Sequence, residues 1–305
     1  MERLQQAAIQ KDLDKKMVFL AGPRQVGKTT VGKALVKVWA NAQYFNWDAE
    51  SDRQIIHRQE WNRKAGLVVL DEFHKSRNWK NRIKGVYDTE GIPPRILVTG
   101  SARLDVYRKG GDSLAGRYFF HRLYPLSVRE LRGQGSPQKI LETLLNLGGF
   151  PEPWLAQSET GAARWRKQHI ERIVREDIRD LNPIREIQAL LLLVDLLRDR
   201  VGSGVSYASL AQDIQVSPHT VQRWIQLLEQ MYVVFTVTPY HRNIARALLK
   251  EPKVYFYDTG AVRGDIGAKL ENTVAVSLIK HLHFLEDTEG VDVRLHYIRD
   301  KEKRE

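Results

Sequence analysis

The sequence predicts an α/β protein whose first half is built on a parallel sheet. Residues 22–29 read GPRQVGKT, which is the P-loop pattern of a glycine, four residues and then Gly-Lys-Thr. A second apolar run, residues 67–70, ends in Asp71 and Glu72. Short apolar runs alternate with helical patterns as far as residue 135, which is typical of βαβ units. Together these observations predict the parallel sheet of a P-loop NTPase.

The P-loop pattern lies between a predicted strand and a predicted helix. Residues 17–21 (MVFLA) form a short apolar run, as expected for a buried parallel strand. Within residues 30–39 one helical face carries Val31, Leu35, Val38 and Trp39. A strand, a glycine-rich turn and a helix N-terminus can surround a phosphate chain with backbone N–H groups. We therefore expect ATP to bind the nine residues Gly22, Pro23, Arg24, Gln25, Val26, Gly27, Lys28, Thr29 and Thr30.

Four side chains near this loop have expected chemical roles. Lys28 would reach the β- and γ-phosphates, and the Thr29 hydroxyl would ligate Mg²⁺. Asp71 would hold the same Mg²⁺, and Glu72 would align and polarise the attacking water. The alternative is a strand that ends in two solvated acids, but its position about forty residues after a P-loop favours the catalytic interpretation.

Three further strands are expected at residues 43–47, 96–99 and 118–123. After the second of these, Thr99 and Ser101 could contact the γ-phosphate or the water, or cap the next helix. Arg103 and Arg117 are candidates for the arginine that neutralises transition-state charge, in cis or from a neighbouring subunit of a homo-oligomer. Solvated or structural roles remain open for both arginines.

Four segments together resemble a large prokaryotic family of AAA-like ATPases. They are GPRQVGKTT, LDEFHKSRNWKNRIKGVYD, ILVTGSAR and SLAGRYFFHRLYPLSVRE, in that order and spacing. That family joins its P-loop core to a winged helix and a C-terminal region of PD-(D/E)XK nuclease type. The resemblance implies that Gly22, Gly27, Lys28 and Thr29 form the nucleotide loop, and that Asp71 and Glu72 are the metal and water pair. It also favours Arg117, which lies in the recurrent SLAGR motif, over Arg103.

Composition restricts the class of protein. The 305 residues suggest two or three domains, and no apolar run approaches the ~20 residues that cross a bilayer, so we expect a cytoplasmic protein without a membrane partner. The absence of cysteine excludes disulfides, thiolate catalysis and Cys-ligated zinc. The net charge of +11 favours polyanionic partners, although the excess is spread along the chain.

The expected domains are an ATPase core (1–135), a helical lid or linker (136–202), a winged helix (203–258) and a partial α+β nuclease-like segment (259–305). The linker should contain helices over residues 139–147, 164–181 and 187–197. Ile170, Ile173, Val174 and Ile178 would form the apolar face of the second helix.

Residues 206–237 have the pattern of a helix-turn-helix followed by a strand. Ser217 and Pro218 give an N-cap and a first-turn proline, which together mark the start of the second helix. Its outward residues would be His219, Thr220, Gln222, Arg223 and Gln226, and two wing strands are expected at residues 233–237 and 254–257. If the module binds double-stranded DNA, Arg223, Arg242 and Lys253 should contact it. The alternative is a lid or a protein-docking surface, because residues 203–253 carry only five Lys or Arg against three acids.

The segments KVYFYDTG, LENTVAVSLIKHL and VRLHYIRDKEKRE resemble the start of the family's nuclease-like region. Glu271 matches the acid on its first helix, and the metal-binding Asp of the family pattern would follow shortly after Glu305, where the sequence stops. Nuclease activity is therefore not expected, because one carboxylate cannot assemble the metal site. Glu271 and Glu305 are then structural or solvent-facing acids.

Two functions remain. The first is Mg²⁺-dependent ATP hydrolysis that couples the nucleotide state to a winged helix acting on DNA. The second is an ATP-switched DNA- or protein-binding module with negligible turnover. Glu72 favours the first, because a pure switch has less need of a carboxylate that polarises water.

Overall fold

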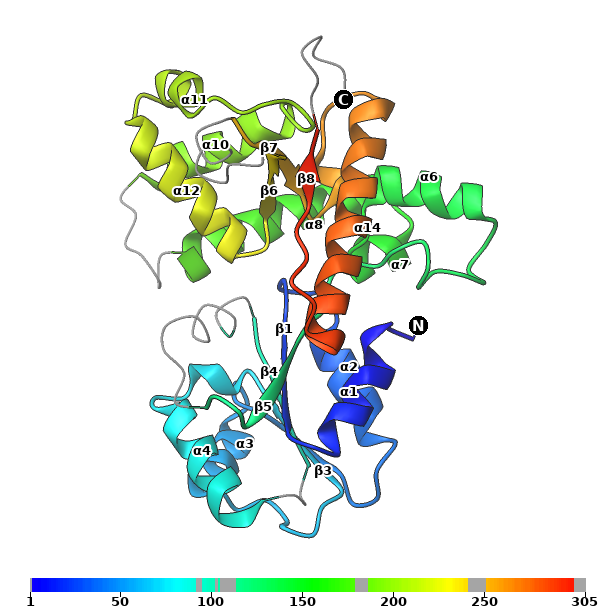
Figure 1. Cartoon of the computed structure of the whole chain (residues 1–305), viewed down its shortest axis with the longest axis vertical. Helices are drawn as coiled ribbons and strands as arrows, with labels where there is room; N and C mark the ends of the chain where they lie inside the picture. The colour runs from blue at the N-terminus through cyan, green and yellow to red at the C-terminus, as the bar shows by residue number, and fades with distance from the viewer. Residues whose placement is uncertain are drawn as a thin grey trace. The chain divides into compact units, whose positions relative to one another are not determined.

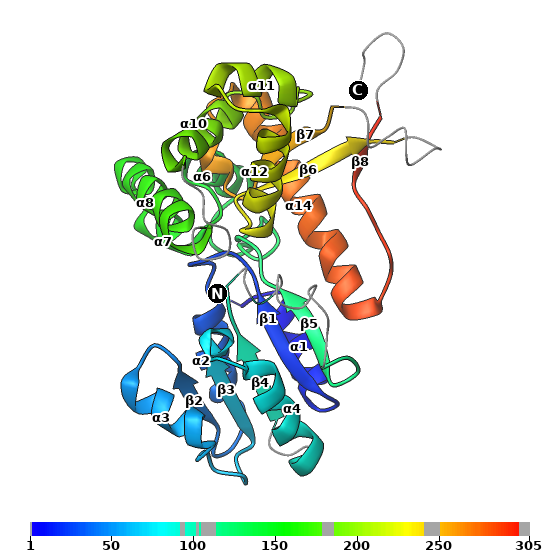
Figure 2. The ribbon, with the colours of Figure 1, turned by 90° about the vertical axis from the view of Figure 1, so that its left-hand side faces the viewer.

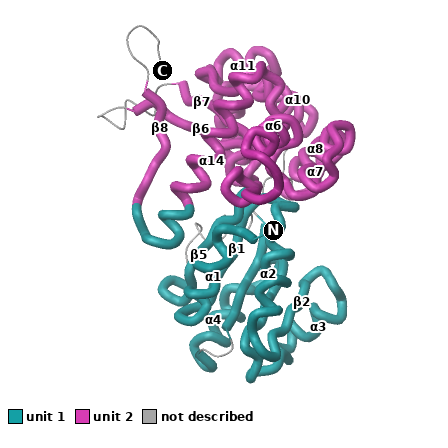
Figure 3. Tube along the Cα trace, turned by 90° about the vertical axis from the view of Figure 1, so that its right-hand side faces the viewer, with its two compact units in different colours: residues 1–124, 284–291 teal, residues 125–283, 292–305 magenta. Residues whose placement is uncertain are grey.

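The computed structural model describes residues 2–91, 95–101, 104, 114–178, 186–240 and 251–298. The chain forms two compact units (Figure 3). Unit 1 contains residues 1–124 and 284–291, and unit 2 contains residues 125–283 and 292–305. Across the described residues, no helix is both long enough and apolar enough to span a bilayer.

Unit 1 is built on a five-stranded sheet in the order β2-β3-β4-β1-β5. All four neighbouring pairs are parallel, which confirms the predicted parallel α/β sheet. The strands lie where the apolar runs predicted them: β1 (Met17–Ala21), β2 (Gln43–Asn46), β3 (Leu67–Asp71), β4 (Arg95–Thr99) and β5 (Tyr118–Arg122). Because the strands are parallel, the residues that follow β1, β3 and β4 lie at one edge of the sheet.

Helices cover both faces of this sheet (Figures 1 and 2). One face carries α1 (Gln5–Leu13) and α2 (Lys28–Val36), and the other carries α3 (Glu50–Arg58) and α4 (Trp79–Glu90). Strands β1 and β3 are buried on both faces, so they read as continuous apolar runs instead of alternating ones.

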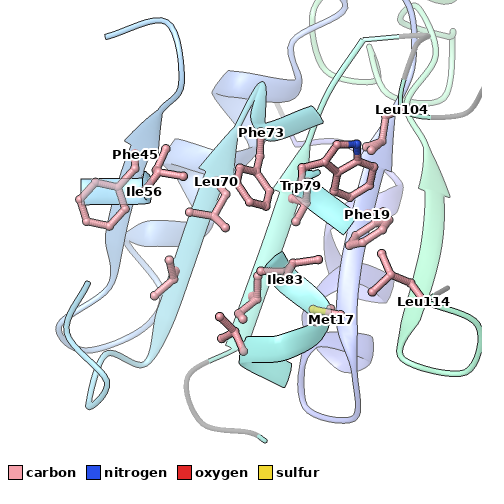
Figure 4. Close-up of a cluster of buried hydrophobic side chains, with 14 of the residues drawn as sticks. Met17, Phe19, Phe45, Ile56, Leu70, Phe73, Trp79, Ile83, Leu104 and Leu114 are labelled. Carbon is pink, nitrogen blue, oxygen red and sulfur yellow. The ribbon is translucent and has the colours of Figure 1, made fainter. Parts of the chain in front are cut away.

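The face under α3 and α4 holds a cluster of large apolar side chains (Figure 4). Phe19 of β1 stacks on Tyr118 of β5 with ring centroids 4.2 Å apart, and its ring also lies 5.6 Å from Trp79 of α4. Ile83 and Val86 add the next turn of α4 to the same cluster. This packing fixes β1, and with it the start of the loop that follows β1.

Two features of unit 1 differ from the sequence expectation. The helix after the P-loop ends at Val36, so Val38 is not on its buried face and is 57% exposed. The helix α1 was not expected at all, because Ile9 and Leu13 are its only large apolar residues; both are fully buried.

Unit 2 begins with helices. They are α6 (Pro137–Leu147), α7 (Pro151–Ala156), α8 (Glu159–Arg172), a π-helical segment (Ile173–Ile178) and α10 (Ile187–Arg198). The helix predicted from residue 164 starts earlier, at Glu159, where the Ser158 hydroxyl accepts a hydrogen bond from the Gly161 N–H. The four residues of its predicted apolar face, Ile170, Ile173, Val174 and Ile178, are all buried.

The second part of unit 2 contains the predicted helix pair and hairpin. The helices are α11 (Tyr207–Ile214) and α12 (Pro218–Gln230), and β6 (Val234–Pro239) pairs antiparallel with β7 (Lys253–Phe256). Ser217 caps α12 as predicted, because its hydroxyl accepts a hydrogen bond from the Thr220 N–H at 3.0 Å. The long helix α14 (Ile266–Glu289) follows, and the short strand β8 (His296–Tyr297) pairs parallel with β6.

Candidate active site

The loop of residues 22–27 leaves β1 at the carboxyl edge of the sheet and leads into α2. Gly27, with φ of 101°, is the N-cap residue, and Lys28 begins the helix. Gly22 has φ of 150°, and a Cβ there would lie 2.2 Å from the backbone oxygen of Leu123, which follows β5. Glycine is required at position 22 for two reasons. Its φ angle is one that other residues rarely adopt, and a side chain there would clash with the backbone after β5.

The side chain of Lys28 folds back over its own loop. Its Nζ donates hydrogen bonds to the backbone oxygens of Gly22 at 2.9 Å and of Pro23 at 2.7 Å. The residue is 6% exposed, so little water competes for the ammonium. A phosphate oxygen would be a stronger acceptor than these neutral carbonyls, because it carries charge.

Asp71 joins three elements of unit 1 through its carboxylate. Oδ2 accepts hydrogen bonds from Thr29 Oγ1 at 2.7 Å and from the Tyr44 hydroxyl at 2.5 Å. Oδ1 accepts one from the hydroxyl of Thr99, at the end of β4. Burial, reinforced by the hydrogen bond to Asp71, raises the pKa of Tyr44, so the phenol remains a donor.

The same group of atoms suits Mg²⁺. Thr29 and Asp71 supply a hydroxyl and a carboxylate oxygen within hydrogen-bonding distance of each other. Mg²⁺ prefers oxygen ligands and is usually held by one or two carboxylates with water and substrate phosphate. The donor set therefore fits the ion that the P-loop implies.

Glu72 follows Asp71 in a left-handed backbone conformation, with φ of 57°. Its N–H donates to the backbone oxygen of Thr99 at 2.9 Å, which fixes this conformation at the sheet edge. Its carboxylate oxygen Oε2 lies 3.3 Å from Lys75 Nζ, and its side chain is 23% exposed. Non-glycine residues in this region are uncommon and cluster at functional sites.

His74 and Ser101 form a contact that the sequence did not predict. Nε2 of the buried His74 ring lies 3.4 Å from Ser101 Oγ and 3.8 Å from Glu72 Oε2. A Cβ on Gly100 would lie 2.5 Å from Nδ1 of the same ring, so the glycine makes room for the imidazole. Ser101 is itself 5% exposed, and its hydroxyl faces His74.

Arg3 holds the other side of the P-loop. It is 6% exposed, and its guanidinium donates to the backbone oxygen of Val26 at 2.9 Å and to that of Tyr124. Sequence reasoning missed this residue because a single arginine near the N-terminus belongs to no motif.

Arg117 lies at the opposite edge of the sheet from the P-loop. It immediately precedes β5, whose first residue pairs with Met17 at the amino end of β1. Arg117 thus lies beside the amino end of β1, whereas the P-loop follows its carboxyl end. Because a strand rises ~3.3 Å per residue, the length of β1 separates Arg117 from the P-loop by roughly 15 Å or more. Arg117 Nε also donates to Asp88 Oδ1 of α4 at 2.6 Å, and this hydrogen bond raises the pKa of Arg117. The cis role considered for Arg117 is therefore wrong, and a role in trans stays a prediction; Arg103 lies outside the described residues.

The residues expected to contact DNA are distributed differently from the prediction. Arg223 is exposed on α12, as expected, and Arg242 lies outside the described residues. Lys253 is 4% exposed, and its Nζ donates to Glu271 Oε1 of α14 at 3.0 Å. The assignment of Lys253 as a phosphate contact is therefore wrong, because its charge is buried and paired within unit 2.

Glu271 has a structural role in the described part of the chain. Besides Lys253, it accepts a hydrogen bond from the Tyr255 hydroxyl at 2.7 Å. The neighbouring Asn272 bonds both backbone groups of Phe256, which fastens α14 to β7. Glu305 lies outside the described residues.

Comparisons with known protein families place these features. Residues 14–132 match a family described as "AAA domain", and residues 138–269 match a domain of unknown function, DUF8612. The first match contains the P-loop, Asp71 and Glu72. This match and the parallel sheet of unit 1 support an AAA-like P-loop ATPase.

The curated relatives extend beyond the part that this chain matches. The chain is 28% identical over 255 residues to the uncharacterized protein Rv2008c of Mycobacterium tuberculosis. The matched region covers 82% of this chain and 56% of that protein. It is 24% identical over 266 residues to an uncharacterized protein of Haemophilus influenzae, covering 77% of the chain and 64% of that relative. The chain thus spans little more than half the length of its mycobacterial relative.

Among solved structures, the chain is similar to the Walker-type ATPase PABY2304 of Pyrococcus abyssi. The TM-score is 0.48 and the identity 16%, over 84% of this chain and 93% of that one. The RuvB Holliday junction branch migration motor of Thermotoga maritima matches with a TM-score of 0.33 and 17% identity, over 81% and 91% of the two chains.

Proposed function

We propose that this protein hydrolyses ATP at the carboxyl edge of the unit 1 sheet, with Mg²⁺ as cofactor. The observation that carries the proposal is the 2.7 Å hydrogen bond from Thr29 Oγ1 to Asp71 Oδ2. This bond joins the residue after the P-loop lysine to the acid at the end of β3, and β3 is two strands away from β1, which the P-loop follows. These are the two positions that together hold the metal in P-loop enzymes.

The loop would bind the phosphate chain of ATP. Backbone N–H groups at the start of α2 carry the positive end of the helix dipole, and Lys28 would turn from the carbonyls of Gly22 and Pro23 to the β- and γ-phosphates. When bound, Mg²⁺ would neutralise charge on the phosphate oxygens. Tyr44 and Thr99 would hold Asp71 in the orientation that the metal requires.

Glu72 would act as the general base toward the attacking water. Lys75 Nζ lies 3.3 Å from its carboxylate oxygen Oε2 and would help to hold the carboxylate in place. Ser101 would contact the γ-phosphate or the water, and His74 connects its hydroxyl to the region of Glu72.

Arg117 would serve the nucleotide of a neighbouring subunit in a homo-oligomer. Its position at the amino edge of the sheet is remote from its own P-loop, while its side chain is 30% exposed. The hydrogen bonds to Asp88 would have to be exchanged for contacts to phosphate.

The proposal is tested by ATP hydrolysis in the wild type and in Lys28→Ala. One preorganised cationic contact to developing charge is typically worth ~3 kcal/mol, so the variant should lose at least ~100-fold in kcat/KM. Wild-type activity should also require added Mg²⁺ and disappear with excess chelator. Equal activity of the two proteins would contradict the proposal.

We further propose that the nucleotide state is coupled to a winged helix formed by α11, α12, β6 and β7, which acts on DNA. The supporting observation is the capped helix α12, whose exposed face carries His219, Gln222, Arg223 and Gln226. The buried state of Lys253 removes one of the three expected contacts, so the proposal now depends on Arg223 and Arg242. If the protein binds ATP but does not hydrolyse it, the alternative function applies, an ATP-switched DNA- or protein-binding module with negligible turnover.

A further inference from the structure

Unit 2 contains a pocket of about 480 Å³ that the nucleotide chemistry does not use. One wall is a single face of α8, with Arg166, Ile170 and Glu171. The facing wall is α10, and the third side is the short turn after β7 that ends at Arg263. A volume of this size is within the range of small-molecule sites, roughly 300–1,000 Å³.

The pocket combines an apolar surface with arginine side chains. Its apolar lining comes from Ile170, Leu191, Val194 and Val262. Its charged lining comprises the cations Arg166, Lys167, Arg198 and Arg263 and the acids Glu171 and Asp195. Arginine is well suited to carboxylate and phosphate groups because its planar fork donates two parallel hydrogen bonds.

Two of these arginines share a single carboxylate oxygen. Asp195 Oδ1 accepts from Arg198 Nη1 at 2.9 Å and from Arg263 Nη2 at 3.0 Å. The next acid, Asp199, is 3.9 Å from Arg263 Nη1 and 57% exposed, so it adds little. This pair of arginines therefore has an excess of positive charge.

The third arginine has its own partner. Arg166 Nε donates to Asp258 Oδ2 at 2.7 Å, and its Nη2 donates to the backbone oxygen of Leu147. A Cβ on Gly260 would lie 2.0 Å from Nη2 of Arg166, so the glycine makes room for the guanidinium. Arg166 is thus held in place, and its charge is balanced before any ligand arrives.

Arg198 shows the effect of the charge excess. Its Nε is buried, and no atom of the described residues accepts a hydrogen bond from it. Burial, together with the neighbouring Arg263 and Arg166, lowers the pKa of Arg198 in spite of Asp195. A donor left without an acceptor in a buried position costs free energy. The Arg198 side chain also lines the pocket and is 14% exposed, so an anionic ligand can reach the guanidinium at atoms other than Nε.

We propose that this pocket binds a small organic anion, with a phosphate or carboxylate group held by Arg198 and Arg263 and an apolar body on Ile170, Leu191, Val194 and Val262. The site lies wholly within unit 2, in the segment that matches DUF8612, and is separate from the P-loop. The proposal does not depend on ATP hydrolysis.

Calorimetric titration with four small probes tests this proposal. Phenyl phosphate and benzoate carry an anionic group on a ring, and benzyl alcohol carries the ring alone. The titrations use the full chain with Lys28→Ala, which weakens competing phosphate binding at the P-loop. At least one of the two anions should bind at least about tenfold more tightly than benzyl alcohol, because a hydrogen bond to a charged group contributes that much or more. The better of the two identifies the anionic group, and inorganic phosphate should bind more weakly than phenyl phosphate because it leaves the apolar lining empty.

Arg263→Ala is the informative variant, because Arg263 is 49% exposed and its loss should leave the fold intact. It should weaken binding of the better anion about tenfold, whereas Arg263→Lys should lose less. Arg164→Ala is the matched control, since Arg164 is exposed on α8 and does not line the pocket. Equal binding of benzyl alcohol and both anions, no binding of either anion at ~10 mM, or equal losses in Arg263→Ala and Arg164→Ala would overturn the proposal.

Discussion

The Tyr44 hydroxyl donates a hydrogen bond to Asp71 Oδ2, and the substitution Tyr44→Phe removes this hydroxyl without changing the rest of the side chain. The tyrosine ring stays in place, where Lys33 Nζ lies 5.2 Å from its centroid. Among the described residues, Asp71 Oδ2 then keeps the hydrogen bond from the Thr29 hydroxyl, and Oδ1 keeps that from Thr99. The variant therefore tests one hydrogen bond to a buried carboxylate.

The magnitude follows from the kind of bond. A hydrogen bond to a charged group contributes roughly 1.5–3 kcal/mol to the free energy of unfolding. Tyr44 is only half buried, so water can partly replace the hydroxyl, and we expect the lower value, about 1.5 kcal/mol. In urea this lowers the unfolding midpoint by ~0.5–1.5 M, since m is typically 1–3 kcal/mol/M.

The pH dependence has a definite sign. The folded state raises the pKa of Tyr44 above its ordinary value of about 10, so its contribution is fully present below pH ~10. It is lost only as the pH rises toward the folded pKa. Urea unfolding followed by tryptophan fluorescence should therefore give the same difference in the free energy of unfolding between the wild type and Tyr44→Phe at pH 7 and at pH 9.

A matched control is Tyr87→Phe, on α4 of the same unit. Its hydroxyl donates no hydrogen bond to the described residues, so this change should alter stability by less than ~0.5 kcal/mol. If Tyr44→Phe is as mild as Tyr87→Phe, or if its effect changes between pH 7 and pH 9, the reasoning about Asp71 is refuted.

Three further predictions concern other parts of the chain. If Arg117 acts in trans, mixing inactive Lys28→Ala and Arg117→Ala proteins should restore part of the ATPase activity; no recovery at any protein concentration would favour a structural Arg117. Lys280→Met leaves Glu130, whose side chain is 0% exposed, without its ammonium partner and should lower the free energy of unfolding by about 3–5 kcal/mol in urea titrations. Adding Glu130→Gln should recover much of that loss, and no recovery would contradict the pairing. Arg223→Ala should reduce the log–log salt slope of duplex DNA binding by about one unit in fluorescence anisotropy; an unchanged slope would remove Arg223 from the interface.

The sequence predicted the centre of the unit 1 sheet because β1, β3 and β4 are short, mainly apolar runs followed by a glycine or an acid. It also predicted the start of α12, where Ser217 and Pro218 act through local geometry alone. The end of α2 was less predictable. Val38 continues the helical apolar pattern, yet the helix ends at Val36 and Val38 is 57% exposed.

The parts of the site that were missed depend on contacts between distant segments. Tyr44 and Asp71 are 27 residues apart, and Arg3 and Tyr124 are 121 apart. Lys253 was misassigned for the same reason. It follows a basic segment, but its partner Glu271 is on α14, and the sequence does not show which side of β7 that helix covers. The SLAGR motif favoured Arg117 over Arg103 but left a role in cis and a role in trans open. The parallel register of β1 and β5 puts Arg117 at the other edge of the sheet, which only the structure shows.

The central claim is that the acid beside Asp71 turns nucleotide binding into hydrolysis. The most direct measurement compares steady-state ATP hydrolysis and equilibrium ATP binding in the wild type and in Glu72→Gln. We expect the variant to bind ATP with unchanged affinity and to turn it over at least ~10²-fold more slowly, because an amide cannot accept the proton from water. Near-normal hydrolysis by Glu72→Gln, or a wild type that binds ATP without turnover, would contradict the claim.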